Sequence, residues 1–237
     1  GPDESCPDVQ NPVAGFAAMM EHLDNNVGTL LGILKEFGID ENTLILLSSD
    51  NGPHGEGGHQ PDFWNSNGDL RGIKRDLYEG GIRVPLLARW KGTIQPGTTE
   101  HVSASWDFVP TFSDLLGQSL KQETDGISML PTFLGLEQPE HEHLYWEFWG
   151  GMEHETMIYR AIRMGKWKAV QGEWLGWSRR EELQSARSLP LELYDLEKDP
   201  GEKQDLSETY PKIVETLLDR MKAEHHPYAN ANLNEQD

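Results

Sequence analysis

The stretch from residue 13 to residue 52 limits the possible folds of this chain more than any other. Residues 13–37 carry apolar side chains at steps of three and four, which predicts an amphipathic helix that ends at Gly38. After a short polar gap, residues 43–48 form a continuous apolar run that suits a strand buried on both faces of a parallel sheet. A helix, a short loop and a buried strand make half of a βαβ unit, so we predict an α/β fold with a mostly parallel sheet.

The pattern changes along the chain and predicts two parts. In the first part, residues 84–88 are predicted to form a strand, residues 107–116 a helix and the region near Leu130 a helical turn. From Leu144 onward, short aromatic or β-branched runs separated by turn residues indicate a small antiparallel sheet, followed by a helix that opens at Pro211. The runs predicted to form this sheet are 144–149, 158–164, 167–171 and 191–196. We therefore predict one domain over residues 1–140 and a smaller one over residues 141–237.

Charge and composition exclude several classes of partner. The formal net charge is −20, which argues against nucleic acid or an anionic membrane as the partner. No run of eighteen apolar residues is present, so no membrane span is predicted. Cys6 is the only cysteine, which excludes a disulfide within the chain. A local group of cations or a bound metal can still create a pocket for an anionic substrate.

Asp50 and Asn51 directly follow the predicted strand and are the first candidates for chemistry. In open α/β sheets, ligands bind at the carboxyl ends of strands. A carboxylate beside an amide oxygen can give two hard oxygen ligands to Ca²⁺ or Mg²⁺, although an all-protein calcium site needs more than two. The alternative is a tight turn, because Asn-Gly is a common turn pair.

Lys74, His54 and His59 are the other candidates. Lys74 lies in a loop before a Gly-Gly pair, and its ammonium group suits a sulfate or phosphate oxygen, although a solvated basic loop is the alternative. His54 lies three residues after Asn51 and could act as a donor or an acid, whereas His59 is predicted to be an ordinary loop histidine. A zinc site made of both histidines and Glu56 fits no known zinc spacing. His141 and His143 lie in a charged connector and are predicted to lie at the surface.

Several segments, taken in order, resemble the type I sulfatases of the alkaline phosphatase-like superfamily. The resemblance covers most of the chain and is specific as a series, although each segment alone is weak. The matching stretches are Met20–Asp24 with Asn26-Val27-Gly28, Asn42–Ile45, Ser49-Asp50-Asn51-Gly52, Leu70–Lys74, Tyr78–Pro85, Asp107–Thr111, Leu193–Leu196 and Asp199-Pro200.

The resemblance implies roles for particular residues. It implies that Asp50 and Asn51 ligate Ca²⁺, with Mg²⁺ as an alternative, and that Lys74 and His54 contact the sulfate and serve catalysis. Arg83 is placed with them among the substrate-binding residues. The implied reaction is the hydrolysis of sulfate esters of a small molecule or glycan, in which a hydrated formylglycine attacks sulfur. The resemblance also implies a periplasmic or extracellular location.

The chain departs from the family pattern at the nucleophile. In the family a C/S-x-P-x-R motif lies far upstream of the Ser-Asp-Asn-Gly segment, and Cys6 lacks the required Pro and Arg. The upstream paired Asp ligands and the upstream Lys and His are also absent. We therefore interpret the chain as the C-terminal portion of a sulfatase, with the formylglycine expected in the missing N-terminal part. The chain is predicted to be inactive alone, and to self-associate or pair with that part.

Two other functions remain open. One is phosphonate or phosphodiester hydrolysis, a related chemistry of the same superfamily, which the upstream nucleophile motif would distinguish. The other is a non-catalytic half-domain that acts as a binding module. A catalytic remnant should bind Ca²⁺ weakly through Asp50 and Asn51, whereas a binding module need not.

Overall fold

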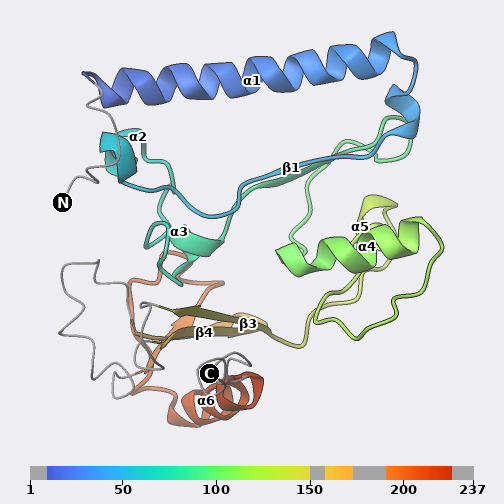
Figure 1. The fold of residues 1–237 in the computed structure, drawn as a ribbon. Coiled ribbons are helices and arrows are strands. Elements are labelled where there is room, and N and C mark those ends of the chain that lie inside the picture. Colours follow the sequence, from blue (N-terminus) through green and yellow to red (C-terminus); the bar gives the residue numbers. More distant parts are fainter. Residues whose placement is uncertain (1–9, 150–157, 173–190, 226–237) are drawn as a thin grey trace, which may run out of the picture. The chain divides into compact units, whose positions relative to one another are not determined.

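The computed structural model describes residues 10–149, 158–172 and 191–225, and it divides the chain into two compact units (Figure 1). The first unit comprises residues 1–74 and 79–142, and the second comprises residues 75–78 and 143–237. The predicted division at residue 140 stays a prediction about independent domains, because a compact segment need not fold alone.

The first unit holds one long helix, a two-stranded sheet and several short helices. The long helix α1 begins and ends as its sequence predicts: Asn11 accepts a hydrogen bond from Ala14 N at 3.1 Å, and Gly38 follows with φ +67°. The elements of this unit are α1 (Pro12–Glu36), η1 (Asp40–Asn42), β1 (Ile45–Ser48), η2 (Glu56–Gly58), α2 (Pro61–Trp64), α3 (Glu79–Ile82), β2 (Leu86–Arg89), η3 (Ser105–Asp107), α4 (Phe108–Leu115) and α5 (Leu130–Phe133).

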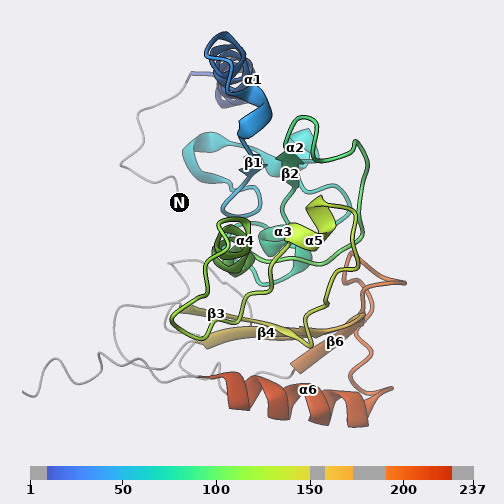
Figure 2. The same ribbon diagram turned by 90° about the vertical axis from the view of Figure 1, so that its right-hand side faces the viewer.

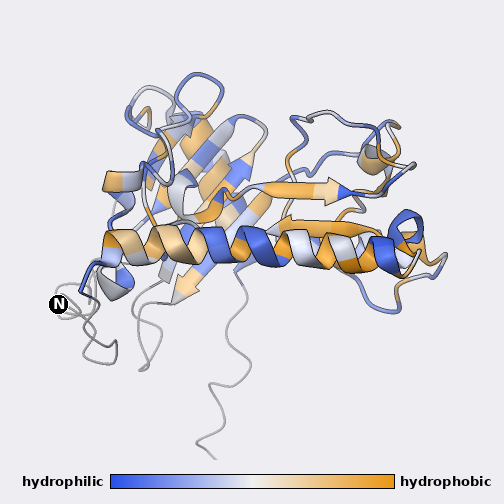
Figure 3. Cartoon of the chain, turned by 90° about the horizontal axis from the view of Figure 1, so that it is seen from above, coloured by the Kyte–Doolittle hydropathy of each residue, from blue (hydrophilic) through white to orange (hydrophobic). Residues whose placement is uncertain are grey.

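Helix α1 runs alongside β1 and contacts η1 and η2 (Figure 1). None of its residues is buried, and several of its large apolar side chains are exposed. Figure 3 shows hydrophobic residues distributed along α1 and concentrated in β1 and β2. Within the described residues, the apolar stripe that predicts this helix therefore lacks a covering layer.

The prediction of a parallel, fully buried sheet is wrong for β1. β1 pairs with β2 in an antiparallel register, from Ile45 opposite Arg89 to Ser48 opposite Leu86. Leu47 is 38% exposed and Leu87 is 58% exposed. The physical reason is that β2 is the one described strand that pairs with β1, so no parallel neighbour completes the sheet.

Asp107 organises the loops around α4, and it also corrects the prediction for His141. The Asp107 carboxylate is fully buried and accepts hydrogen bonds from Ala104 N and Ile127 N, each at 2.8 Å. The side chain of His141 is only 7% exposed, and its Nε2 lies 3.0 Å from that carboxylate. His143 is also mostly covered and lies 3.1 Å from Glu224. Both histidines were predicted at the surface, and both are instead held by buried or half-buried carboxylates.

The second unit is the predicted antiparallel sheet with a helix packed along it (Figure 2). The strands follow the order β3-β4-β5-β6, and all neighbouring pairs are antiparallel. One face of the sheet and the apolar stripe of α6 form the core, which includes Ile162, Leu193, Leu217 and Met221. The elements are β3 (Leu144–Trp149), β4 (Ile158–Met164), β5 (Trp167–Gln171), β6 (Leu191–Asp195) and α6 (Pro211–Glu224). The short aromatic or β-branched runs and the turn residues between them therefore predicted this sheet correctly.

A buried ion pair lies in the second unit. Lys168 Nζ is 2.8 Å from Glu202 Oε1, and both side chains are fully buried. A charge removed from water requires such a partner, and this pair joins β5 to the chain after β6. Over the described residues, no helix has the length and apolar character needed to cross a membrane.

Candidate functional site

Two glycines let three segments of the first unit pass within hydrogen-bonding distance of each other. Gly52 N donates to Gly81 O at 2.9 Å, and Gly80 N donates to Arg71 O at 2.6 Å. A Cβ atom on Gly52 would lie 1.9 Å from Gly80 O, and one on Gly80 would lie 2.2 Å from Gly72 O. Any larger residue at either position would therefore force these backbones apart. We call this close approach of three segments the backbone crossing. It holds the segment after β1 against the segments around residues 71–74 and 79–81.

Asp50 and Asn51 lie at the start of this crossing, directly after β1. Asp50 is exposed and Asn51 is half-buried. The Asn51 amide donates from Nδ2 to Gly52 O at 2.9 Å, and Ser49 Oγ donates to Asn51 O at 2.9 Å. This arrangement leaves Asn51 Oδ1 and the Asp50 carboxylate without a hydrogen-bond donor among the described residues. Two neighbouring hard oxygen donors fit Ca²⁺ or Mg²⁺ in kind, and they supply part of the six to eight ligands that Ca²⁺ takes.

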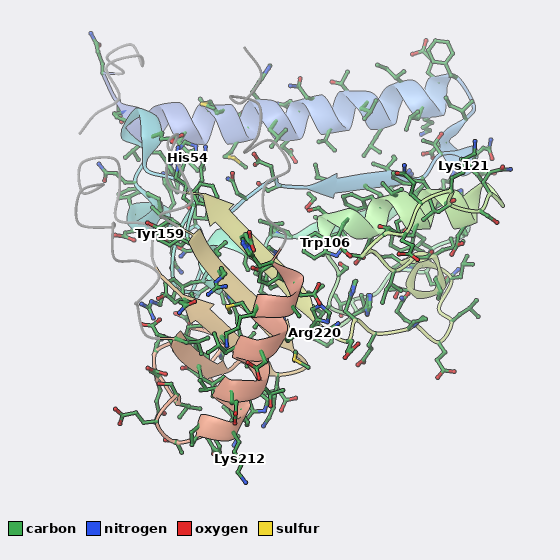
Figure 4. The ribbon with its side chains drawn as sticks, turned by 60° about the horizontal axis from the view of Figure 1, so that its bottom comes forward. His54, Trp106, Lys121, Tyr159, Lys212 and Arg220 are labelled. Carbon is green, nitrogen blue, oxygen red and sulfur yellow. The ribbon has the colours of Figure 1, made fainter. Side chains whose placement is uncertain are left out.

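The crossing also brings Lys74 to the loop that carries His54. Lys74 N donates to Pro53 O at 2.7 Å, so the two backbones are in direct contact. At the side chains, Lys74 Nζ lies 3.2 Å from Glu56 Oε2. His54 Nδ1 accepts a hydrogen bond from Glu56 N at 3.0 Å, and it lies 3.6 Å from Glu56 Oε2. Figure 4 shows His54 in the loop between β1 and α2. Glu56 therefore contacts two candidate sulfate-binding residues, Lys74 through its carboxylate and His54 through its backbone N–H.

His59 belongs to an aromatic cluster next to this loop. Its ring lies 3.9 Å from the Phe16 ring and 5.9 Å from the His54 ring, measured between centroids. The Trp64 ring also lies near Phe16, at 5.9 Å between centroids. Burial, followed by the charge of nearby His54, lowers the pKa of His59. His59 is thus a packed loop residue whose pKa lies below its ordinary value.

Arg83 is not joined to the other candidates. It lies just after α3 and points back to Glu79, whose Oε2 is 3.6 Å from Arg83 Nη1. Glu79 is buried, whereas the Arg83 side chain is 51% exposed. No ion pair or hydrogen bond joins Arg83 to His54 or Lys74 in the described part of the chain. Its role in substrate binding remains a prediction.

Four of the five predicted site residues therefore gather at one place: Asp50, Asn51, His54 and Lys74. Their roles as metal ligands and sulfate contacts stay predictions. Sequence reasoning missed Glu56 as the residue that contacts both Lys74 and His54, because it considered this residue only as a zinc ligand. The position of His54, two residues before Glu56, could have indicated a contact between them. Cys6 lies outside the described residues.

Two protein-family models match the chain. The model described as "Sulfatase" matches residues 2–118. The model described as "N-sulphoglucosamine sulphohydrolase, C-terminal" matches residues 73–226, which is more than half of the chain. The first match includes every candidate residue of the site.

Curated proteins with similar sequences carry sulfatase names. The chain is 34% identical to arylsulfatase A of Homo sapiens over 228 residues, which cover 88% of this chain and 43% of that protein. It is 32% identical to choline-sulfatase of Rhizobium meliloti, covering 81% of this chain and 32% of that protein. It is 27% identical to N-acetylgalactosamine-6-O-sulfatase of Bacteroides thetaiotaomicron, covering 85% of this chain and 40% of that protein. The chain thus spans less than half the length of these relatives.

Solved structures that resemble this chain are also much longer than it is. The crystal structure of Ps i-CgsB gives a TM-score of 0.72 at 29% identity, covering 92% of this chain and 44% of that one. A Bacteroides thetaiotaomicron structure from work on glycosaminoglycan metabolism gives 0.69 at 27% identity, covering 85% and 42%. The similarity shows that the described elements correspond to part of an alkaline phosphatase-like sulfatase fold. On these matches, the chain belongs to the sulfatase family.

Proposed function

We propose that this chain supplies metal-binding and sulfate-binding side chains of an enzyme that hydrolyses sulfate esters. The observation that carries the proposal is the backbone crossing at Gly52 and Gly80, which gathers Asp50, Asn51, His54 and Lys74 in one loop cluster. The family models and the sulfatase names of the relatives favour this chemistry over phosphonate or phosphodiester hydrolysis. Nothing among the described contacts favours a non-catalytic half-domain that acts as a binding module.

Each group has a role that its chemistry allows. Asp50 and Asn51 would hold a calcium ion, and a bound calcium ion would withdraw negative charge from the sulfate during attack. Lys74 would donate to a sulfate oxygen as a compact cation. His54 would donate a hydrogen bond to the sulfate or to the departing oxygen. The attacking group would be a formylglycine that these 237 residues do not encode.

We propose a sulfated glycan or a sulfated small molecule as the substrate. Two comparisons support a glycan: Ps i-CgsB was solved in complex with k-i-k-neocarrahexaose, at 28% identity and a TM-score of 0.72, and a relative is named for N-acetylgalactosamine-6-O-sulfate. The choline-sulfatase relative supports a small molecule instead. The sulfate group is common to both, so the first test uses sulfate itself.

The test measures the binding of inorganic sulfate to the chain by nuclear magnetic resonance. Sulfate should shift the signals of residues 52–56 and 72–75 in a saturable way. Lys74→Met should weaken this binding by about ten-fold or more, because a hydrogen bond to a charged group is lost. Lys121→Met, which removes an exposed lysine elsewhere in the first unit, is the matched control and should bind like the wild type. Equal sulfate affinity in Lys74→Met and wild type would contradict the site.

We also propose that the chain pairs with the remainder of a sulfatase domain or with itself. The exposed apolar side chains of α1, among them Met19 at 69% and Leu30 at 50%, support a covering partner. Alone, the chain should not turn over a sulfate ester in the presence of Ca²⁺. A monodisperse monomer of the isolated chain in light scattering would contradict self-association, and reproducible turnover would contradict the predicted inactivity.

A further inference from the structure

We propose that Glu56 is a positioning residue that prepares both His54 and Lys74 for an incoming sulfate. The inference rests on the proposed function and adds a residue to it. Glu56 acts in two ways: its backbone N–H accounts for the position of the proton on His54, and its carboxylate binds Lys74 from the position that the sulfate later takes.

The backbone contact decides which ring nitrogen of His54 carries the proton. Glu56 N donates to His54 Nδ1 at 3.0 Å, so Nδ1 must be the unprotonated nitrogen. The neighbouring carboxylate oxygen lies 3.6 Å from Nδ1, which is too long for a competing hydrogen bond. The proton of the neutral ring therefore sits on Nε2. This tautomer gives His54 an N–H donor on the ring nitrogen that Glu56 does not engage, which is what a sulfate oxygen requires.

The carboxylate contact prepares Lys74. Lys74 Nζ lies 3.2 Å from Glu56 Oε2, and the two side chains are 30% and 36% exposed. An ion pair this accessible to water is weak, so a dianion can displace it. Before sulfate binds, Glu56 keeps the flexible lysine side chain beside His54. When sulfate binds, Lys74 exchanges one anionic partner for another, and the displaced carboxylate then repels the sulfate.

The exchange predicts an unusual direction for the Glu56→Gln variant. Removing the carboxylate removes a competitor for Lys74 and a repelling charge, so inorganic sulfate should bind more tightly by about two- to five-fold. A residue that merely supports the loop would weaken sulfate binding when changed. Glu123→Gln, which removes the same charge from an exposed loop, is the matched control and should leave the affinity unchanged.

The second measurement reads the tautomer directly. Long-range ¹⁵N–¹H spectra of the histidine rings distinguish the two neutral forms, and a His54→Asn variant assigns the signal. We expect the Nε2–H form for His54 in the wild type and in Glu56→Gln, because the backbone N–H is present in both. A His54 ring protonated on Nδ1 would overturn the proposal, as would a Glu56→Gln variant that binds sulfate no more tightly than wild type or than Glu123→Gln.

These outcomes separate this inference from the proposed function. If Lys74→Met leaves sulfate binding unchanged, the sulfate site itself is wrong. If Lys74→Met weakens binding but Glu56→Gln does not strengthen it, the site stands and the role of Glu56 is wrong. The tautomer measurement needs no sulfate and therefore tests the backbone contact from Glu56 to His54 in either case.

Discussion

Replacing Gly52 by alanine should destabilise the first unit and open the candidate site. A Cβ atom at this position would lie 1.9 Å from Gly80 O, whereas real Cβ atoms essentially never come closer than 3.0 Å to another heavy atom. The contact is with backbone on both sides, so no flexible side chain can move to relieve it. Separating the segments enough would stretch the 2.9 Å hydrogen bond from Gly52 N to Gly81 O beyond its useful range.

The expected size of the effect has two parts. Overpacking costs about 1–3 kcal/mol, and the loss of one hydrogen bond costs about 0.5–1.5 kcal/mol. The free energy of unfolding should therefore fall by about 1.5–4.5 kcal/mol. Because the same crossing holds Lys74 beside the His54 loop, sulfate affinity should fall as well.

Gly55→Ala is the matched control for this prediction. Gly55 lies in the same loop with φ −96°, a conformation open to alanine, and an added Cβ would find only His59 O at 3.9 Å. Its effect should stay within about 0.5 kcal/mol of the wild type. Urea unfolding followed by near-ultraviolet circular dichroism measures both variants. If Gly52→Ala is as stable as Gly55→Ala, the reasoning from the backbone crossing is refuted.

Three further predictions concern the rest of the chain. Lys168→Met should lower the free energy of unfolding in urea by about 3–5 kcal/mol, because it removes the cation that faces the buried Glu202 carboxylate. Lys168→Met combined with Glu202→Met should recover most of this loss. If the losses of the two single variants instead add up in the double variant, the prediction is wrong. Asp107→Ala should lower stability by about 1–3 kcal/mol, since it leaves two half-buried backbone donors without their carboxylate acceptor, and an unchanged urea midpoint would argue against this network. His59→Gln should flatten the pH dependence of stability. Because burial lowers the pKa of His59 in the folded chain, the unfolded chain binds more protons, so wild-type stability falls as pH drops below the ordinary value of 6.5. If the free energy of unfolding changes equally with pH in wild type and His59→Gln between neutral and mildly acidic pH, the prediction is wrong.

The second unit was predictable because its signals are local. Its strands are short runs that are in part aromatic or β-branched, and Gly165, with φ +56°, marks the turn between β4 and β5. The apolar stripe after Pro211 likewise predicted α6, which buries Leu217 and Met221 against the sheet. In each case, residues close in sequence determine both the element and the face that it buries.

The sheet of the first unit was less predictable, because an apolar run indicates that a strand suits a buried environment. It does not report which neighbours are present. The run at residues 43–48 suits a strand with covering layers on both faces, whereas the described strand β1 pairs only with β2 and leaves Leu47 exposed. A parallel partner cannot be inferred from one strand, since the pairing depends on distant residues.

The candidate site shows the same limit. The motif around Asp50 and Asn51 and the segment around Lys74 were visible in the sequence as separate pieces. Their approach depends on the backbone crossing at Gly52 and Gly80, which brings together residues more than twenty positions apart. The bond between Lys74 and Glu56 spans eighteen positions and follows from that crossing, so residue spacing alone could not predict it.

Calcium binding at Asp50 and Asn51 tests the central claim, that the chain carries part of a sulfatase metal and sulfate site. Titrating the ¹⁵N-labelled chain with CaCl₂ should give weak, saturable shifts centred on residues 49–53, since only part of the ligand set is present. Asp50→Asn should abolish these shifts, and Asp69→Asn, which removes an exposed carboxylate from the following loop, should leave them intact. Shifts that are absent from the wild type, or that persist in Asp50→Asn, would contradict the account.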